Sequence, residues 1–171
     1  MADGGSEMMM QAFKPDPTNT RALRDAFGRF ASGITIVTAA SDDGPVGITA
    51  NSFSSLSLDP PLVLWSPDAK SRRFPYFAAA KHYAIHVLAV EQEALCHGFS
   101  KSAFAFDGLD MDLSANGVPL IKNCLARFEC EQRIVYPGGD HKIVVGEVMA
   151  AEMRDGDALT FFAGQIRSLE G

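Results

Sequence analysis

Two long segments near the C-terminal end carry the feature that most constrains the fold. Residues 124–135 alternate in character, which predicts a strand with one apolar and one charged face. The apolar face comprises Ala126, Phe128, Cys130 and Ile134, and the charged face comprises Arg127, Glu129, Glu131 and Arg133. Gly138-Gly139-Asp140 is a turn signal, and residues 142–154 form a second long strand. A hairpin of this length needs further strands to cover its apolar face, so the chain is expected to build a sheet.

Shorter segments supply those strands. Residues 34–38 and 46–49 read as a hairpin around the turn 41–44, and strands are expected at 62–65, 82–89 and around 161–162. Helices are expected from about residue 18 to Gly33, over 75–80 and over 91–99. About seven strands with few helices predict a mainly β fold, a closed antiparallel β-barrel with peripheral helices.

The N-terminal segment lacks any such pattern. Residues 1–17 hold glycines, a run of methionines and two prolines without apolar period, and they are expected to be disordered. Residues 18–171 are expected to form a single domain, since one domain of about 100–200 residues is usual at this length.

Composition excludes several classes of function. The chain has 15 Lys and Arg against 21 Asp and Glu, a net charge of −6, which argues against a nucleic-acid partner. No apolar run approaches the roughly 20 residues of a membrane helix, so no membrane association is expected. The three cysteines form no C-x-x-C pair, which favours reduced core thiols in a cytoplasmic protein.

Common site motifs are missing from the sequence. It contains no G-x-G-x-x-G after a strand, no G-x-x-x-x-G-K-[ST] and no G-x-S-x-G, which argues against Rossmann, P-loop and serine-hydrolase sites. His82 and His86 lie four residues apart on a predicted strand, and this places them about 13 Å apart. That separation is too large for one metal ion, so no metal site is expected.

The most informative stretch is 47–61, where a strand runs into a segment rich in hydroxyl side chains. Small hydroxyl residues let backbone N–H groups approach an anion or a flat heterocycle, and their oxygens add hydrogen-bonding groups without bulk. The group comprises Thr49, Ala50, Asn51, Ser52, Ser54 and Ser55, with a double proline ending the stretch. The competing interpretation is an ordinary polar loop.

Three further stretches are weaker signals. In Gly138-Gly139-Asp140-His141, the carboxylate can orient the adjacent imidazole, although a plain hairpin turn explains the same residues. In 66–73, Ser71 with Arg72 or Arg73 can hold a phosphate at the start of a short helix. Phe99-Ser100-Lys101 places a ring and a cation at a helix end.

In their order along the chain, these stretches resemble the flavin reductase family of the FMN-binding split barrel, the reductase component of two-component flavin monooxygenases. The resemblance covers roughly residues 22–170. It is carried by Phe27 to Thr38, Thr49-Ala50-Asn51-Ser52-Phe53, Ser57-Leu58-Asp59-Pro60-Pro61-Leu62-Val63, Gly139-Asp140-His141 and Gly146-Glu147-Val148.

The resemblance implies a homodimeric Greek-key barrel that reduces FMN or FAD with NADH or NADPH and passes reduced flavin to an oxygenase. By position, the segment 49–52 would line the isoalloxazine ring and the start of the ribityl chain. The phosphate end would be served by Ser66, Ser71 and Lys101, with Trp65 and Phe99 packing nearby. His141 would position the nicotinamide. The sequence departs from the family pattern at Ile166. Many members carry an aromatic residue at this position, two residues after the glycine that corresponds to Gly164.

Other functions remain open at this point. A split-barrel oxidase with tightly bound FMN, a non-catalytic flavin-binding electron carrier or sensor, and a barrel that serves only as an interaction module would each fit the same fold. The choice between FMN and FAD is also open, as is that between NADH and NADPH, whose 2′-phosphate favours a nearby arginine. Arg72, Arg73 and Arg133 are the arginines considered for that role.

Overall fold

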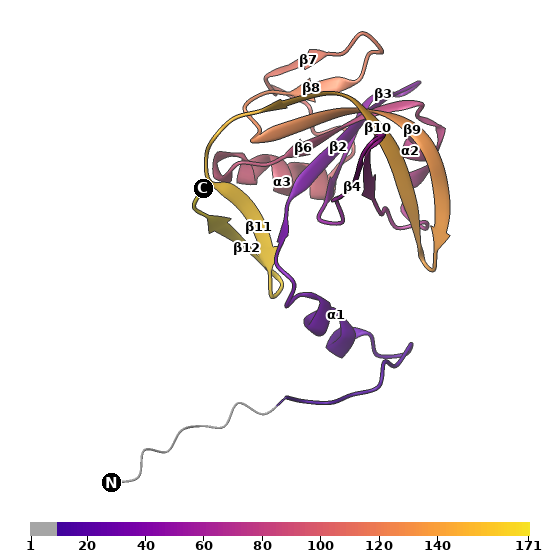
Figure 1. Cartoon of the computed structure of the whole chain (residues 1–171), viewed down its shortest axis with the longest axis vertical. Helices are drawn as coiled ribbons and strands as arrows, with labels where there is room; N and C mark the ends of the chain where they lie inside the picture. The colour runs from indigo at the N-terminus through magenta and orange to yellow at the C-terminus, as the bar shows by residue number, and fades with distance from the viewer. Residues whose placement is uncertain (1–9) are drawn as a thin grey trace.

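An antiparallel sheet of seven strands forms the body of the protein in the computed structural model, which describes residues 10–171 (Figure 1). Its strands are β2 (Thr35–Ser41), β3 (Gly44–Ala50), β4 (Ser54–Leu58), β5 (Pro61–Trp65), β6 (His82–Val87), β9 (Ala126–Gly138) and β10 (His141–Met153). They pair in the order β3-β2-β6-β9-β10-β5-β4. The sheet curls around its core while β3 and β4 remain its two edges, as in a split barrel.

Smaller elements surround this sheet. A three-stranded sheet joins β1 (Ser32–Gly33), β11 (Ala158–Phe162) and β12 (Gln165–Leu169), and a two-stranded one joins β7 (Met111–Leu113) and β8 (Pro119–Ile121). The helices are α1 (Arg21–Phe27), α2 (Phe74–Ala79) and α3 (Glu93–Lys101), with a 3₁₀ turn at Val90–Gln92. The predicted mainly β fold with peripheral helices is therefore confirmed.

The core lies inside the curled sheet and continues under α3. In the first part, Trp65, Phe77 and Tyr83 are almost fully buried, and the Trp65 and Phe77 rings meet edge to face with centroids 5.2 Å apart. In the second part, Phe99 of α3 packs with Phe106 at 4.8 Å. The half-buried Ile166 packs against this second part from β12, so an aliphatic side chain occupies the position where the family pattern has a ring.

The long β9–β10 hairpin has the extent predicted from the alternating pattern, but one prediction about its faces is wrong. Ile134 is exposed, and the half-buried Val135 packs on the core in its place. The reason is a β-bulge: Gln132 pairs with Gly146 and Ile134 with Val145, so Arg133 is an extra residue. One extra residue shifts the period-two alternation, which reverses the faces beyond it.

Other elements also differ from the sequence prediction, and the strands β7 and β8 were not predicted. The serine-rich stretch is not one loop, because residues 54–58 form β4, the edge strand that pairs with β5. The first helix ends at Phe27 and does not reach Gly33, which instead pairs in β1. The strand β12 was missed, since the period of its five residues is weak and pairing with β11 decides its conformation.

The histidine pair on β6 is divided between two environments. His82 is half-buried, whereas His86 is fully buried and hydrogen-bonded through both ring nitrogens. Its Nδ1 lies 3.0 Å from the Ile36 carbonyl oxygen, and its Nε2 accepts the Ile121 N–H at 3.1 Å. His86 therefore joins β6 to β2 and β8 within the core.

The N-terminal part of the described chain stands apart from the body (Figure 1). Helix α1 has no buried residue and extends from β1, held by the N–H of Ala163 donating to the Gly28 carbonyl at 2.8 Å. Residues 1–9, part of the segment predicted to be disordered, lie outside the described residues. Within residues 10–171, no helix is long and apolar enough to cross a membrane.

Candidate functional site

A cavity of about 440 Å³ opens where the ends of β3 and β5 meet the turn of the β9–β10 hairpin. This volume falls in the usual range for small-molecule sites. Its lining comes from three segments and is largely small and polar: Ile48, Thr49, Ala50, Asn51, Ser52, Trp65, Ser66, Pro67, Asp68, Ser71 and His141. The cavity thus collects residues that lie far apart in the sequence.

The first wall is the end of β3, which α3 holds in place. The Thr49 hydroxyl donates to the Cys96 carbonyl of α3 at 2.8 Å. Gly47 lets α3 approach closely, because a Cβ at this position would lie 2.5 Å from a ring carbon of Phe99. The contacts with α3 hold β3 in place, and Ala50 and Asn51 line the cavity where this strand ends.

The second wall is the segment that follows β5. The Ser52 hydroxyl accepts the Ser66 N–H at 2.9 Å and donates to the Ser66 carbonyl at 3.2 Å. Trp65 packs beneath this wall, fully buried, with its indole N–H lacking a hydrogen-bond partner. The first and second walls are therefore joined directly by one serine side chain.

The third side is the hairpin turn that carries His141. Asp68 and His141 pair as an isolated β-bridge, and the Lys142 N–H donates to the Pro67 carbonyl at 3.0 Å. His141 Nδ1 lies 2.7 Å from an oxygen of Asp140, and this hydrogen bond lowers the pKa of the Asp140 carboxyl. A carboxylate at Nδ1 holds the proton on that nitrogen and leaves Nε2 for other partners.

Ser71 closes the cavity just before α2. Its N–H donates to the Asp68 carbonyl at 3.1 Å, and its hydroxyl accepts the Arg73 N–H at 3.2 Å. The Arg73 guanidinium points away from this turn and donates to the Phe99 and Ser100 carbonyls at the end of α3. Arg73 is half-buried, and this burial lowers the pKa of its guanidinium.

Most of the residues predicted from the sequence lie in this cavity. Eight of them line it: Thr49, Ala50, Asn51, Ser52, Trp65, Ser66, Ser71 and His141. Four lie outside the lining: Ser54 and Ser55 are exposed on β4, Phe99 is buried against Gly47, and Lys101 is exposed at the end of α3. Three lining residues were missed, Ile48, Pro67 and Asp68. Pro67 and Asp68 directly follow Ser66, but only their pairing with the distant hairpin brings them to the site.

The chemistry of the lining suits binding and orientation. It offers hydroxyl, amide and backbone groups with one imidazole and the Asp68 carboxylate, and no Lys or Arg is among the described residues that line it. Such donors match the carbonyl edges and ring nitrogens of a planar heterocycle. Thiol chemistry is disfavoured: burial raises the pKa of Cys130 to about 12, and it also raises the pKa of Cys96 and Cys124.

Comparison with known proteins agrees with this geometry. The model of the "Flavin reductase like domain" family matches residues 27–170. The chain is 51% identical to "FMN reductase (NADH) SmoA" of Agrobacterium fabrum (strain C58 / ATCC 33970) over 89% of this chain and 87% of that protein. It is 35% identical to "Flavin-dependent monooxygenase, reductase subunit HsaB" of Rhodococcus jostii (strain RHA1), covering 93% and 83%.

Solved structures show the same fold. BorF, the flavin reductase component of a bacterial two-component tryptophan halogenase, superposes with a TM-score of 0.83 at 36% identity, covering 90% of this chain and 99% of that one. The NADH:FAD oxidoreductase SgcE6 of Streptomyces globisporus C-1027, in complex with NAD and FAD fragments, gives 0.84 at 37%, covering 91% and 96%.

Some relatives are much longer: the chain spans only 46% of one from Rhizobium meliloti (strain 1021), at 41% identity. The match of the family model nevertheless covers most of the chain, and it includes every segment that lines the cavity. The chain therefore belongs to the flavin reductase like domain family.

Proposed function

We propose that this protein is a NADH-dependent flavin reductase, which transfers a hydride from the nicotinamide to FMN or FAD. The observation that carries the proposal is the cavity itself, in which the hydroxyl and backbone groups of residues 49–52 share one space with His141. The names of the relatives SmoA and SgcE6, which specify NADH with FMN or FAD, support the choice of reductant and acceptor.

The residues of the cavity fit a flavin on chemical grounds. The backbone at Ala50 and Asn51 and the Asn51 side-chain amide supply hydrogen-bonding groups for the carbonyl edge of the ring, while the Thr49 and Ser52 hydroxyls, which donate to the Cys96 and Ser66 carbonyls, hold this segment in place. Groups aimed at that edge stabilise the negative charge that develops on reduction. Ser66 and Ser71 lie toward the phosphate end, with Lys101 at the nearby end of α3 as the source of positive charge. A bound flavin supplies the hydride acceptor.

His141 positions the reductant in this proposal. With its Nδ1 proton directed to Asp140, the imidazole offers Nε2 as an acceptor for the carboxamide N–H of NADH. The hydride then moves with its electron pair from the nicotinamide to the flavin, and NAD⁺ is left. No side chain needs to exchange a proton in that step, so the contribution of the protein is alignment of the two rings.

The reduced flavin is proposed to serve an oxygenase component. HsaB is named a reductase subunit of a flavin-dependent monooxygenase, and BorF a reductase component of a two-component halogenase. No Lys or Arg is among the described residues that line the cavity, and Lys101 lies outside the lining, so a phosphate would be held weakly, which favours a flavin that leaves after reduction. The cytoplasm remains the proposed location, in line with three free cysteines.

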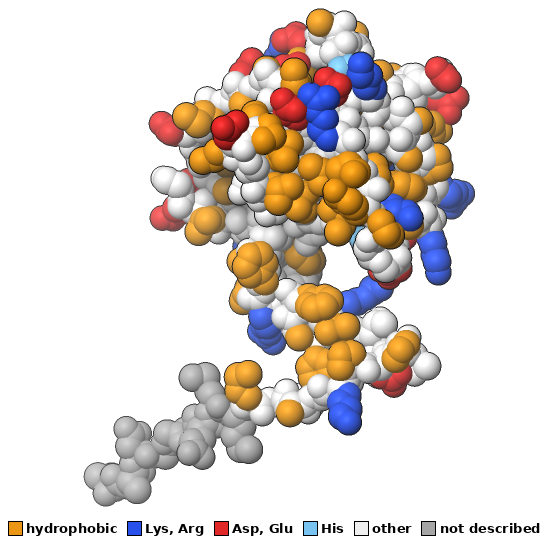
Figure 2. All heavy atoms as spheres, turned by 45° about the vertical axis from the view of Figure 1, so that its right-hand side comes forward, with side chains coloured by type: hydrophobic (Ala, Val, Ile, Leu, Met, Phe, Trp, Pro, Cys, Tyr) orange, Lys and Arg blue, Asp and Glu red, His pale blue; other side chains and the backbone are white. Residues whose placement is uncertain are grey.

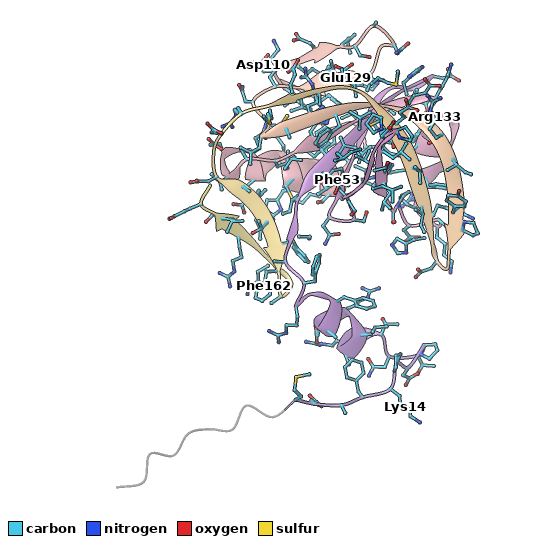
Figure 3. All side chains as sticks on the ribbon, viewed as in Figure 1. Lys14, Phe53, Asp110, Glu129, Arg133 and Phe162 are labelled. Atoms are coloured by element: carbon cyan, nitrogen blue, oxygen red, sulfur yellow. The ribbon has the colours of Figure 1, made fainter. Side chains whose placement is uncertain are left out.

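We also propose that residues 18–171 act as one split-barrel domain that forms a homodimer. On α1 and its continuation, Phe27 is 68% and Phe30 is 82% exposed, and contiguous exposed apolar side chains are typical of an interaction surface. Figure 2 shows hydrophobic side chains gathered over α1 and across the facing part of the body. Phe162 lies at the tip of the β11–β12 hairpin, on the side of α1 (Figure 3). A second copy would cover these rings.

A steady-state assay that crosses FMN and FAD with NADH and NADPH tests the function. Purified protein is expected to oxidise NADH only when free flavin is added, with NADH preferred over NADPH. A yellow protein that retains its flavin and never turns over would instead identify an electron carrier or sensor. Tightly bound FMN with turnover of an organic substrate would identify an oxidase, and colourless, inert protein an interaction module.

A further inference from the structure

The side chain of Arg73, the residue directly before α2, reaches the end of α3. Its Nη2 donates to the Ser100 carbonyl at 3.0 Å, and its Nη1 donates to the Phe99 carbonyl. Both carbonyls belong to the last turn of α3, where the helix itself leaves carbonyl groups unpaired. A guanidinium is well suited to this position because it brings several donors and a positive charge to the negative end of the helix.

At its other end, Arg73 belongs to the turn that carries Ser71. The Arg73 N–H donates to the Ser71 hydroxyl at 3.2 Å, and the Phe74 N–H donates to the Ser71 carbonyl at 3.0 Å. Ser71 lines the cavity, whereas the Arg73 side chain is directed away to α3. A displacement of Arg73 would therefore move Ser71 relative to α3.

Helix α3 in turn holds the opposite wall. It receives the Thr49 hydroxyl at the Cys96 carbonyl, and its Phe99 ring lies against Gly47. Just beyond α3, the Ala103 carbonyl accepts the Gly47 N–H at 2.8 Å. These contacts fix β3 to α3 and to the residues just beyond it. A movement of the last turn of α3, to which Arg73 is bound, would therefore also move Thr49.

From this arrangement we propose that Arg73 is a positioning residue for flavin binding: it fixes the distance between Ser71 and Thr49 across the cavity through α3, without touching the flavin. The contact of Arg73 with α3 is a second connection across the cavity, besides the bond between Ser52 and Ser66. This proposal rests on the proposed flavin site. It differs from the interpretation of Arg73 as a phosphate ligand, because Nη1 and Nη2 are both directed to carbonyls of α3, those of Phe99 and Ser100.

A comparison of FMN with riboflavin distinguishes a positioning residue from a phosphate ligand, since riboflavin carries the isoalloxazine ring and the ribityl chain without a phosphate. The affinities of FMN and riboflavin are measured by flavin fluorescence for the wild-type protein, Arg73→Gln and Arg73→Lys. Lys81→Gln is the matched control, because Lys81 is also cationic, is exposed and lies outside the cavity lining. Thermal melting is recorded for each variant, and NADH turnover is measured at limiting and saturating FMN.

Arg73→Gln is expected to weaken FMN and riboflavin by the same factor, about tenfold. It should raise the KM for FMN while kcat at saturating FMN stays near the wild-type value. Arg73→Lys should restore part of the affinity, because an ammonium group can reach one of the carbonyls but cannot span both. Lys81→Gln should bind both flavins like the wild type.

Two results would overturn the proposal. A loss confined to FMN would make Arg73 a phosphate ligand, and unchanged binding of both flavins would make its bonds to α3 irrelevant to the site. A lower melting temperature with unchanged affinity for both flavins would likewise reduce Arg73 to a stabilising residue. If the wild-type protein itself binds neither flavin, the proposed function fails, and this is distinguishable because it appears without any substitution.

Discussion

The hydroxyl of Ser52 and the backbone of Ser66 form a two-way hydrogen bond, in which the hydroxyl accepts the Ser66 N–H at 2.9 Å and donates to the Ser66 carbonyl at 3.2 Å. These residues follow β3 and β5, which are separate strands of the sheet. The contact uses a side chain that the resemblance assigns to the ligand, so Ser52 supports the shape of the cavity as well as lining it.

Ser52→Ala is expected to lower the free energy of unfolding by about 1 kcal/mol, the usual net value of a lost hydrogen bond. It should weaken flavin binding more than stability alone would explain, because the two walls lose their direct connection. Urea unfolding and flavin titration measure the two effects. Ser54→Ala is the control, since Ser54 is exposed on β4 and outside the lining. Equal flavin affinity in the two variants would count against the role of Ser52.

His141→Ala is expected to raise the KM for NADH more than it lowers kcat, because the imidazole orients the nicotinamide and takes no part in hydride transfer. Asp140→Ala should act in the same direction but less strongly, since the ring loses only the carboxylate 2.7 Å from Nδ1. Asp140→Asn keeps an acceptor oxygen and should recover most of the loss. Steady-state kinetics with varied NADH provide the measurement, and an unchanged KM in His141→Ala would refute the assignment.

Gly146→Ala is expected to destabilise the fold by about 1–3 kcal/mol, the typical cost of an oversized group in a packed core. The added Cβ would lie 2.1 Å from the Tyr83 hydroxyl oxygen, and Tyr83 is too buried to move aside. Chemical denaturation measures the loss. In Tyr83→Phe the same substitution should cost less, because the nearest atom is gone and the buried hydroxyl has no hydrogen-bond partner. Gly33→Ala, which meets no atom within 4 Å, should be nearly neutral.

Acid should destabilise the protein through His86. Burial lowers the pKa of this imidazole from 6.5 to about 4, because the charged form is poorly solvated and the positive charge of Arg127 lies nearby, while the hydrogen bond to the Ile36 carbonyl opposes the shift only in part. The unfolded chain takes up the proton first as the pH falls below 6.5. The contribution of His86 to the free energy of unfolding is therefore fully present above pH 6.5. It declines as the pH falls to about 4, by about 3 kcal/mol in total.

Urea unfolding at a series of pH values measures this decline. His86→Gln should unfold more easily at pH 7 and show a shallower pH dependence between 6.5 and 4. An equally steep dependence in that variant would assign the acid sensitivity to other groups.

Phe27→Glu and Phe30→Glu are expected to convert a dimer into monomers, because a carboxylate at either position cannot be buried against a second copy without a partner. Sedimentation velocity gives the oligomeric state, and circular dichroism shows whether the fold is kept. Arg21→Glu, on the same helix and 90% exposed at its side chain, changes charge without removing a ring. A wild-type protein that is monomeric at all concentrations would contradict the homodimer.

Local pattern was enough to predict much of this protein. The alternation over 124–135, the glycine turn at 138–139 and the β-branched run at 34–38 predicted the long hairpin and the first strands, because they depend on period and turn chemistry. Thr49 to Ser52 were also predicted, since they form one short polar segment, whereas Trp65 and Ser66 were assigned only through the resemblance to the family. The exposed face of Ile134 was mispredicted, because a bulge depends on the pairing with β10 and has no signal in a single strand.

Tertiary structure decided which polar residues meet. Ser52 and Ser66, like Arg73 and Ser100, are far apart in sequence and joined by hydrogen bonds, and Asp68 and His141 are brought together as a β-bridge. Sequence alone determined that the chain would form a β-sheet with a small polar site. The curled sheet determined that Arg73 binds the end of α3 and that Phe99 supports β3 from behind, because such contacts arise only when distant elements share one core.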